Sequence, residues 1–485
     1  MTVKSRLIAW VLALSLSACA GTPERNVPEG VADGLPDQFT DVLQGSDADV
    51  PVEWWKAFGD PQLEQLVEGG LNYNSDLIIA AGRLREARAA VRSSRAKQLP
   101  DISVFIDGTR ERTPLVNPSD QSLGHTSIVE SGSYGVSVGY EVDLWGRLAA
   151  ETEAERQRYL AQGYTLAALR LTIAAELVRG YLQSQTLIDS RAVLEENVKV
   201  LEDQLRLSQR RYALGAISAL DLQRFRSELE DSRAQLAETT RQQQQTERAL
   251  VLLAGELPTK DALAGLNIRR EGVTPAGLPP VPTGLPSSLL DRRPDLRAAE
   301  SDLAGAGADL SAAKRAWFPN LAITGAAGEV SSNLSNLFAN GLSIWSIGAN
   351  LTESIFDGGR RSAAIEASAA RREQLVEVYR DTARRAFTEV LDALDARSTA
   401  TEVHRARTAQ SEALQTALHL AQLQYDQGYA DYLGVLDARR SLLQSRLAVA
   451  EARRSGGAAY VNLVLAVGGG WDPGPELNRL ESALR

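Results

Sequence analysis

The chain of 485 residues has little sulfur and few aromatic side chains. Its one cysteine, Cys19, excludes an intrachain disulfide, a thiolate zinc cluster and a CxxC redox pair. Three histidines lie far apart and offer little to a metal site or a catalytic triad: His125, His404 and His419. Aromatic residues make up 6% of the chain, which is low for one large dry core. The composition therefore favours something other than a single globule.

Charge and missing motifs exclude further classes of function. The net charge is −10, and an acidic chain lacks the basic footprint that binds nucleic acid. There is no GxxxxGK[ST] phosphate loop, and Gly305 and Gly307 fit close helix packing better than a dinucleotide fingerprint. No nucleophile, base and acid stand together in a catalytic pattern. We therefore expect no enzymatic activity, no cofactor and no metal.

The amino terminus has the layout of a secretory signal. Residues 1–18 combine a basic start at Lys4 and Arg6 with an apolar run of about ten residues, too short to cross a bilayer. Leu16-Ser17-Ala18-Cys19 is similar to a bacterial lipobox, which implies cleavage before Cys19, a diacylglycerol on its sulfur and an acyl chain on its amino group. By the same resemblance, Ala20 favours the outer membrane. The alternative is a plain signal peptide with a chance cysteine.

An internal repeat organises the rest of the chain. At an offset of 213, Tyr212 and Gly215 align with Tyr425 and Gly428, and further upstream the offset is 219. The six extra residues of the first copy lie between residues 100 and 146. We predict an N-terminal segment 19–69, a first repeat 70–257, a linker 258–289, a second repeat 290–470 and a tail 471–485.

Each half reads as mainly helical. Proline, which breaks helix interiors, is absent from 119–257 and from 320–472. Each half is predicted to contain a short helix (75–98; 295–317), two strands, a long helix (148–214; 361–427), a glycine turn and a medium helix (219–254; 432–467). At 1.5 Å per residue these span roughly 35, 100 and 55 Å. We therefore expect a short and a medium helix to stack end-on beside each long helix.

The long and medium helices carry heptad patterns. Leu194, Val198, Leu201 and Leu205 alternate steps of four and three, and Leu222, Phe225, Leu229 and Ser232 do so on the return. This indicates coiled-coil hairpins. The mixture of leucine with small and polar seam residues favours a thin-walled helical tube, with a solid helical bundle as the alternative.

The predicted strands alternate apolar with polar or small residues. Tyr134, Val136, Val138, Tyr140, Val142 and Leu144 share one face of the first copy, and Trp345, Ile347, Ala349 and Leu351 share one face of the second. The period fits a membrane β-barrel wall, although a half-buried soluble sheet has the same period. Four strands cannot close a barrel, and open edges do not survive in lipid. Two, three or four chains are therefore expected to share the wall.

Several motifs together resemble the outer membrane factor family, the TolC-like export channels, and specifically the lipoprotein branch typified by NodT and OprM. They are Trp54-Trp55-x-x-Phe58-x-Asp60-Pro61-x-Leu63, Tyr140-Glu141-Val142-Asp143-Leu144-Trp145-Gly146-Arg147, Arg292-Arg293-Pro294-Asp295-Leu296-x-x-Ala299-Glu300, Phe318-Pro319, Ile355-Phe356-Asp357-Gly358-Gly359-Arg360 and Gly468-Gly469-Gly470-Trp471. The resemblance implies a mainly α fold with a membrane β-barrel: a trimer whose 12-strand barrel continues into a 12-helix periplasmic tunnel. Thr352-Glu353-Ser354 stands where the family usually has a proline.

The resemblance also assigns candidate sites at the two glycine turns. It implies that the turns dock a periplasmic adaptor protein, while the glycines also cap helices: Gly215, Ala216, Ile217, Ser218, Gly428, Tyr429, Ala430 and Asp431. Leu433, Asp437 and Arg440 share one helical face and align with the family's aperture residues, although they also fit ordinary solvated helix positions. Asp426 stands where some relatives have arginine, which alters the pairing between protomers known there.

We therefore predict a passive outer membrane exit duct for small molecules, lipid-anchored and opened by the adaptor. Energy would come from an inner-membrane transporter of the proton-driven RND type. The same channel serving type I protein secretion is one alternative. A lipid-anchored coiled-coil protein without a pore is another.

Overall fold

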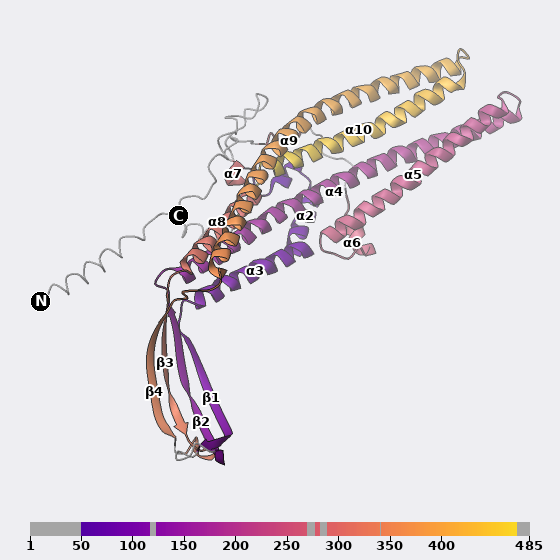
Figure 1. Ribbon diagram of the computed structural model, residues 1–485. Coiled ribbons are helices and arrows are strands. Elements are labelled where there is room, and N and C mark those ends of the chain that lie inside the picture. The colour runs from indigo at the N-terminus through magenta and orange to yellow at the C-terminus, as the bar shows by residue number, and fades with distance from the viewer. Residues whose placement is uncertain (1–49, 117–122, 269–276, 282–288, 340, 473–485) are drawn as a thin grey trace.

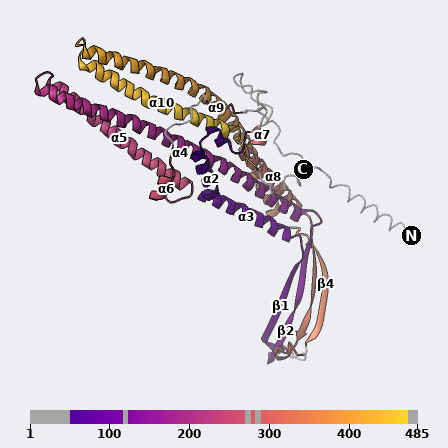
Figure 2. The same cartoon turned by 180° about the vertical axis from the view of Figure 1, so that it is seen from behind.

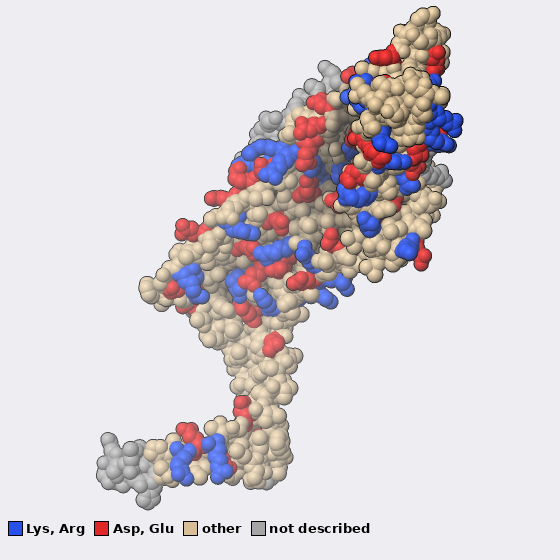
Figure 3. Space-filling view, turned by 90° about the vertical axis from the view of Figure 1, so that its right-hand side faces the viewer, with Lys and Arg blue, Asp and Glu red and all other residues tan. Residues whose placement is uncertain are grey.

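The computed structural model describes residues 50–116, 123–268, 277–281, 289–339 and 341–472. The chain is long and divided along its length: a narrow sheet forms one end, and two helical hairpins reach away from it to the other (Figure 1). Lys, Arg, Asp and Glu interleave over the helical part in Figure 3, whereas most of the sheet surface carries no charge. Cys19 and the predicted signal lie outside the described residues.

Both halves contain the same elements, as the repeat predicted. In each, a short helix leads to two strands, then a 67-residue helix, a turn and a 35-residue helix. The first half contains α3 (Ser75–Ala96), β1 (Asp101–Val116), β2 (Leu123–Val142), α4 (Arg147–Ala213) and α5 (Ala219–Leu253). The second contains α8 (Pro294–Arg315), β3 (Asn320–Ser331), β4 (Leu342–Thr352), α9 (Arg360–Asp426) and α10 (Tyr432–Ala466).

The four strands form one antiparallel sheet in the order β1-β2-β3-β4. β2 pairs with β3 from Gly132 to Val142, and its earlier residues pair with β1 alone. The extra residues of the first copy therefore lengthen the β1–β2 hairpin. β2 ends at Val142, so Leu144, predicted to continue the alternation, lies beyond the strand.

The helices form a wall one helix thick. Near the sheet the packing order is α3, α4, α8, α9, and toward the far end it is α5, α4, α10, α9 (Figures 1 and 2). The predicted seam is buried along α4 and α5, for example at Leu194, Leu201, Phe225 and Leu229. The thin-walled arrangement is confirmed and the solid bundle is wrong.

Short and medium helices meet end-on at two equivalent joints, as their lengths predicted. At the first joint Asn74 donates its side-chain amide to the carbonyl of Leu253, at 2.9 Å. At the second, Arg293 donates to the carbonyl of Ala466, also at 2.9 Å. The donors are related by the offset of 219 and the acceptors by the offset of 213. Each bond satisfies one of the carbonyls that a helix leaves unpaired at its end.

A glycine with positive φ permits each close approach. Gly255 has φ +87° and Gly468 has φ +95°, a region that side chains disfavour. A Cβ on Gly255 would overlap the carbonyl of Tyr73, and one on Gly468 would lie 2.9 Å from the carbonyl oxygen of Arg292. The next residues complete the joint, because Trp471 donates its indole N–H to that same carbonyl at 2.6 Å.

An N-terminal strap, η1 (Trp54–Phe58) with α2 (Pro61–Tyr73), packs across one face of the wall. Trp54, Trp55 and Phe58 are buried in the main core cluster. Asp60 caps α2 and accepts a hydrogen bond from the Tyr181 hydroxyl at 2.6 Å. The tryptophan motif thus fastens the strap to α4. The strap helices, α6 (Lys260–Gly265) and α7 (Leu289–Arg292) were not predicted.

The strand-to-helix bend of the second half is held by an arginine. Arg361 pairs with Asp357 at 2.8 Å and with Glu353 at 2.6 Å, and its guanidinium lies 4.6 Å from the centre of the Trp317 ring. Glu353 belongs to the tripeptide that replaces the family's proline. In this chain an ion pair therefore holds the backbone at a bend where the family usually has the restricted backbone of a proline.

We expect Gly468→Ala to lower the thermal unfolding midpoint, measured by circular dichroism. A left-handed conformation is unfavourable for alanine by roughly 1–2 kcal/mol, and the added Cβ would press on the backbone at residue 292. Gly434→Ala in α10, the helix that Gly468 follows, is the control, because its Cβ would meet no described atom within 4 Å and alanine favours helix by about 0.5–1 kcal/mol. Equal losses in both variants would contradict the joint.

Candidate functional site

The two glycine turns lie side by side at the end of the molecule away from the sheet (Figures 1 and 2). Gly215 and Gly428 have φ of +71° and +77° and end α4 and α9. The N–H of Ala216 donates to the carbonyl of Arg211 at 2.8 Å, and the N–H of Tyr429 donates to that of Gln424 at 2.9 Å. These bonds satisfy the last carbonyls of the long helices, so the capping interpretation is confirmed.

Most of the predicted docking residues are exposed. A Cβ at Gly215 or Gly428 would meet no described atom within 4 Å, so the glycines are needed for φ and not for space within the chain. Tyr429 is 83% exposed. Ile217 instead packs partly against a cluster between the two tips. Ser218 forms a capping box with Asp221. The other members are exposed: Ala216, Ala430 and Asp431.

Aromatic side chains join the two tips. Phe225 of α5 and Tyr432 of α10 lie with ring centroids 4.4 Å apart, and Tyr425 of α9 meets Tyr432 at 5.0 Å. Arg211 of α4 donates to the Tyr425 hydroxyl at 2.5 Å. Each of the four hairpin helices thus contributes one of these side chains. The sequence placed Phe225 on a seam but gave no sign of the contact between hairpins.

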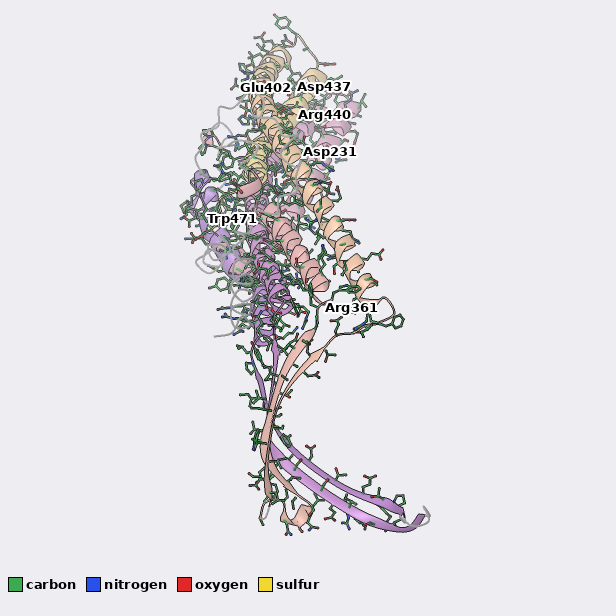
Figure 4. All side chains as sticks on the ribbon, turned by 60° about the vertical axis from the view of Figure 1, so that its left-hand side comes forward. Asp231, Arg361, Glu402, Asp437, Arg440 and Trp471 are labelled. Carbon is green, nitrogen blue, oxygen red and sulfur yellow. The ribbon has the colours of Figure 1, made fainter. Side chains whose placement is uncertain are left out.

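The predicted aperture residues share one exposed face of α10. Leu433 is 42% exposed, while Tyr432, Val435 and Leu436 turn into the tip cluster. Asp437 and Arg440 lie close together toward the side of the molecule on which Asp231 also appears (Figure 4). The 4 and 3 spacing therefore places the three side chains together, as predicted.

Arg440 forms an ion pair with Glu228 of α5. Glu228 is 11% exposed and Arg440 56% exposed, so the pair lies at the edge of the contact between the hairpins. The hydrogen bond to Glu228 raises the pKa of Arg440, and the charges of Asp437 and Asp231 act in the same direction. Sequence reasoning missed Glu228, although its place one turn after Phe225 offered a signal. Asp426 accepts a hydrogen bond from Gln422 of its own helix at 3.2 Å.

Among the described residues, no group of three or more His, Cys, Asp or Glu residues is placed to hold a metal ion. Nor does any described helix have the length and apolarity required to cross a membrane.

The fold and the matched motifs define a class of protein. The chain superposes on the open-state MtrE outer membrane channel of Neisseria gonorrhoeae with a TM-score of 0.80 and 26% identity, covering 93% of this chain and 98% of that one. A model described as outer membrane efflux protein matches residues 67–256 and 285–469. The chain belongs to the outer membrane efflux protein family.

Similar proteins extend over nearly the whole chain. Outer membrane protein OprJ of Pseudomonas aeruginosa is 35% identical over 97% of this chain and 96% of its own length. The toluene efflux pump outer membrane protein TtgC of Pseudomonas putida is 32% identical over 96% of each. The protein is therefore an outer membrane channel component of an efflux system. This confirms the resemblance and leaves the coiled-coil protein without a pore unsupported.

We expect Tyr432→Phe to keep or raise stability by up to about 1 kcal/mol, because the Tyr432 hydroxyl is buried without a hydrogen-bond partner among the described residues. Burial also raises the pKa of Tyr432 from 10.0 to about 12. The folded protein then keeps the phenol proton where the unfolded chain loses it, so this residue's contribution to stability falls as pH rises from about 10 to 12.

Thermal midpoints of wild type and Tyr432→Phe at pH 9 and pH 11.5 test this, since the variant should lose less on going to high pH. Phe225→Ala is the contrast, because it removes packing with an expected loss of about 3–5 kcal/mol. A destabilised Tyr432→Phe at pH 9 would contradict the assignment.

Proposed function

We propose that three copies of this chain close into one duct across the outer membrane and the periplasm. Among the described residues, β1 and β4 each pair along one edge only, so the sheet presents two open edges. Open edges are not tolerated in lipid, and pairing β4 of one copy with β1 of the next removes them. Three copies give 12 strands and, from a wall four helices wide, 12 helices. The open sheet edges carry this proposal.

The duct is proposed to be lipid-anchored through Cys19, the first residue of the N-terminal segment. The strap, which begins later in this segment, is held on one face of the wall by Trp54, Trp55 and Phe58. A fastened strap keeps the anchor on the outside of the tube and the lumen free.

The tips are proposed to dock a periplasmic adaptor that couples the duct to an inner-membrane transporter of the RND type. Exposed turns at the far end of the duct, with Tyr429 exposed beside Gly428, support this. The name of TtgC, a toluene efflux pump protein, supports small-molecule export over type I protein secretion. The chain itself would act as a passive conduit and not as an enzyme.

Asp437 and Arg440 are proposed to form a latch at the periplasmic aperture. Three Asp437 carboxylates converging on one axis would repel each other unless they were paired. Arg440 is held against Glu228 within its own chain, beside Asp437. The latch thus combines a tie between hairpins with a ring of acids, and displacing the hairpins would open it.

We expect Asp437→Ala with Arg440→Ala to raise single-channel conductance in planar bilayers, because both the acid ring and the hairpin tie are lost. Glu238→Ala with Arg241→Ala removes an exposed pair of α5 and should leave conductance at the wild-type level. Unchanged conductance in the first variant would refute the proposed latch. Absence of any conductance in wild type would refute the proposed duct.

Docking is tested by Gly215→Trp with Gly428→Trp, which should abolish capture of the purified adaptor. Bulk at an exposed turn blocks close approach of a partner helix. Asparagine tolerates the left-handed conformation, so Gly215→Asn with Gly428→Asn is the control and should keep most binding. Both variants are first checked for intact assembly by size-exclusion chromatography. Wild-type capture by the tryptophan variant would refute docking at the tips.

A further inference from the structure

A recess with a volume of about 610 Å³ lies at the joint of α8 and α10. α4 and α9 form its two side walls, and Arg293, Pro294 and Ala466 at the joint form its floor. The volume is within the range of small-molecule sites. Neither the aperture nor the tips include any of its residues.

The recess opens on the face of the wall opposite the strap. Leu177 meets Gly70 of the strap and Tyr181 bonds to Asp60, so both mark the covered face of α4. At 100° per residue, Arg179 lies about 180° and Thr172 about 160° from the mean direction of those two. In the proposed closed duct the strap is outside, so the recess faces the lumen.

The arginine on the floor of the recess is already paired with two carboxylates. Arg293 is 7% exposed and pairs with Glu389 at 2.7 Å and with Asp295 at 2.8 Å. Its Nη1 donates to the carbonyl of Ala466 at 2.9 Å. This arginine therefore holds the joint, and the walls of the recess carry the charges that have no counterion among the described residues.

The two walls carry opposite charges that have no ion pair among the described residues. Arg179 of α4 donates to the neutral amide oxygen of Asn462 at 2.6 Å, and the acid whose charge acts on it, Glu176, is one turn earlier on its own helix. Burial lowers the pKa of Arg179, which marks a cation that lost hydration without gaining a carboxylate. Asp392 stands on the facing wall of α9. The offset of 213 makes these two residues equivalent in the repeat, so they lie at the same height.

Apolar surface separates the two charges. Small or aliphatic side chains line the recess beside Thr172 and the two carboxylates that pair with Arg293, Asp295 and Glu389: Ala168, Leu171, Ala393, Ala396 and Leu465. A ligand that satisfies both walls must carry an anion and a cation joined by an apolar body.

We propose that this recess binds amphipathic zwitterions on their way through the duct. The anionic group of the solute accepts from Arg179 beside Asn462, its ammonium group pairs with Asp392, and its apolar body covers Leu171 and Leu465. The luminal placement rests on the proposed closed assembly. The binding chemistry does not depend on adaptor docking or on the latch.

Saturation-transfer NMR on the purified assembled protein tests the site with 6-aminohexanoate as probe. We expect saturation of its methylene protons, and a signal at least several-fold weaker for hexanoate and for hexylamine, which each carry one of the two charges. Equal signals from all three compounds, or none from 6-aminohexanoate, would overturn the proposal.

Variants test which wall residue binds which charged group of the probe. Arg179→Gln should remove most of the hexanoate signal and spare hexylamine, whereas Asp392→Asn should do the reverse. Arg179→Asp with Asp392→Arg should restore 6-aminohexanoate binding in the opposite orientation. Glu195→Gln changes an exposed residue of the same helix outside the recess, paired only with Arg191 among the described ion pairs, and should change nothing. If Arg179→Gln and Asp392→Asn match wild type in intact assemblies, the site is wrong; if wild type forms no closed assembly, the duct itself is wrong.

Discussion

Everything in this structure depends on the two joints at which a short and a medium helix meet end-on. A wall one helix thick has no second layer to hide unpaired backbone, so the carbonyls at each joint must be satisfied within it. Asn74 and Arg293 donate to equivalent carbonyls, and Gly255 and Gly468 permit the approach. The two broken lines of helix, α3 with α5 and α8 with α10, can then run alongside the two unbroken 67-residue helices, and the wall keeps its width from the sheet to the tips.

The two joints also show how a repeat diverges. The first is closed by a neutral amide, and the second by an arginine that must then be neutralised by Glu389 and Asp295. The charged joint has the recess above it, and its wall residues Arg179 and Asp392 are repeat partners of opposite sign. A duplicated scaffold has thus acquired asymmetric chemistry at equivalent positions, while the backbone geometry stayed the same.

Much of the fold could be predicted because local sequence patterns indicate its helices, strands and turns. Long proline-free spans, the heptads through Leu194 and Phe225, and the turns at Gly215 and Gly428 gave helix ends within about two residues of those observed. The motifs around Trp54 and Arg293 identified the family. The ion pair of Arg440 with Glu228 and the packing of Phe225 on Tyr432 were missed, because they join residues more than 200 positions apart and no local period records such contacts.

The sequence by itself determined the repeat, the length and order of its helices and strands, and the positions of the two turns at the tips, since these follow from periodicity, proline and glycine. Only the tertiary structure decided which residues meet across the hairpins, that Glu353 replaces a proline bend with an ion pair to Arg361, and that Arg179 and Asp392 flank one recess. The physical reason is that backbone preferences act over a few neighbours, whereas side-chain pairing depends on which faces packing brings together.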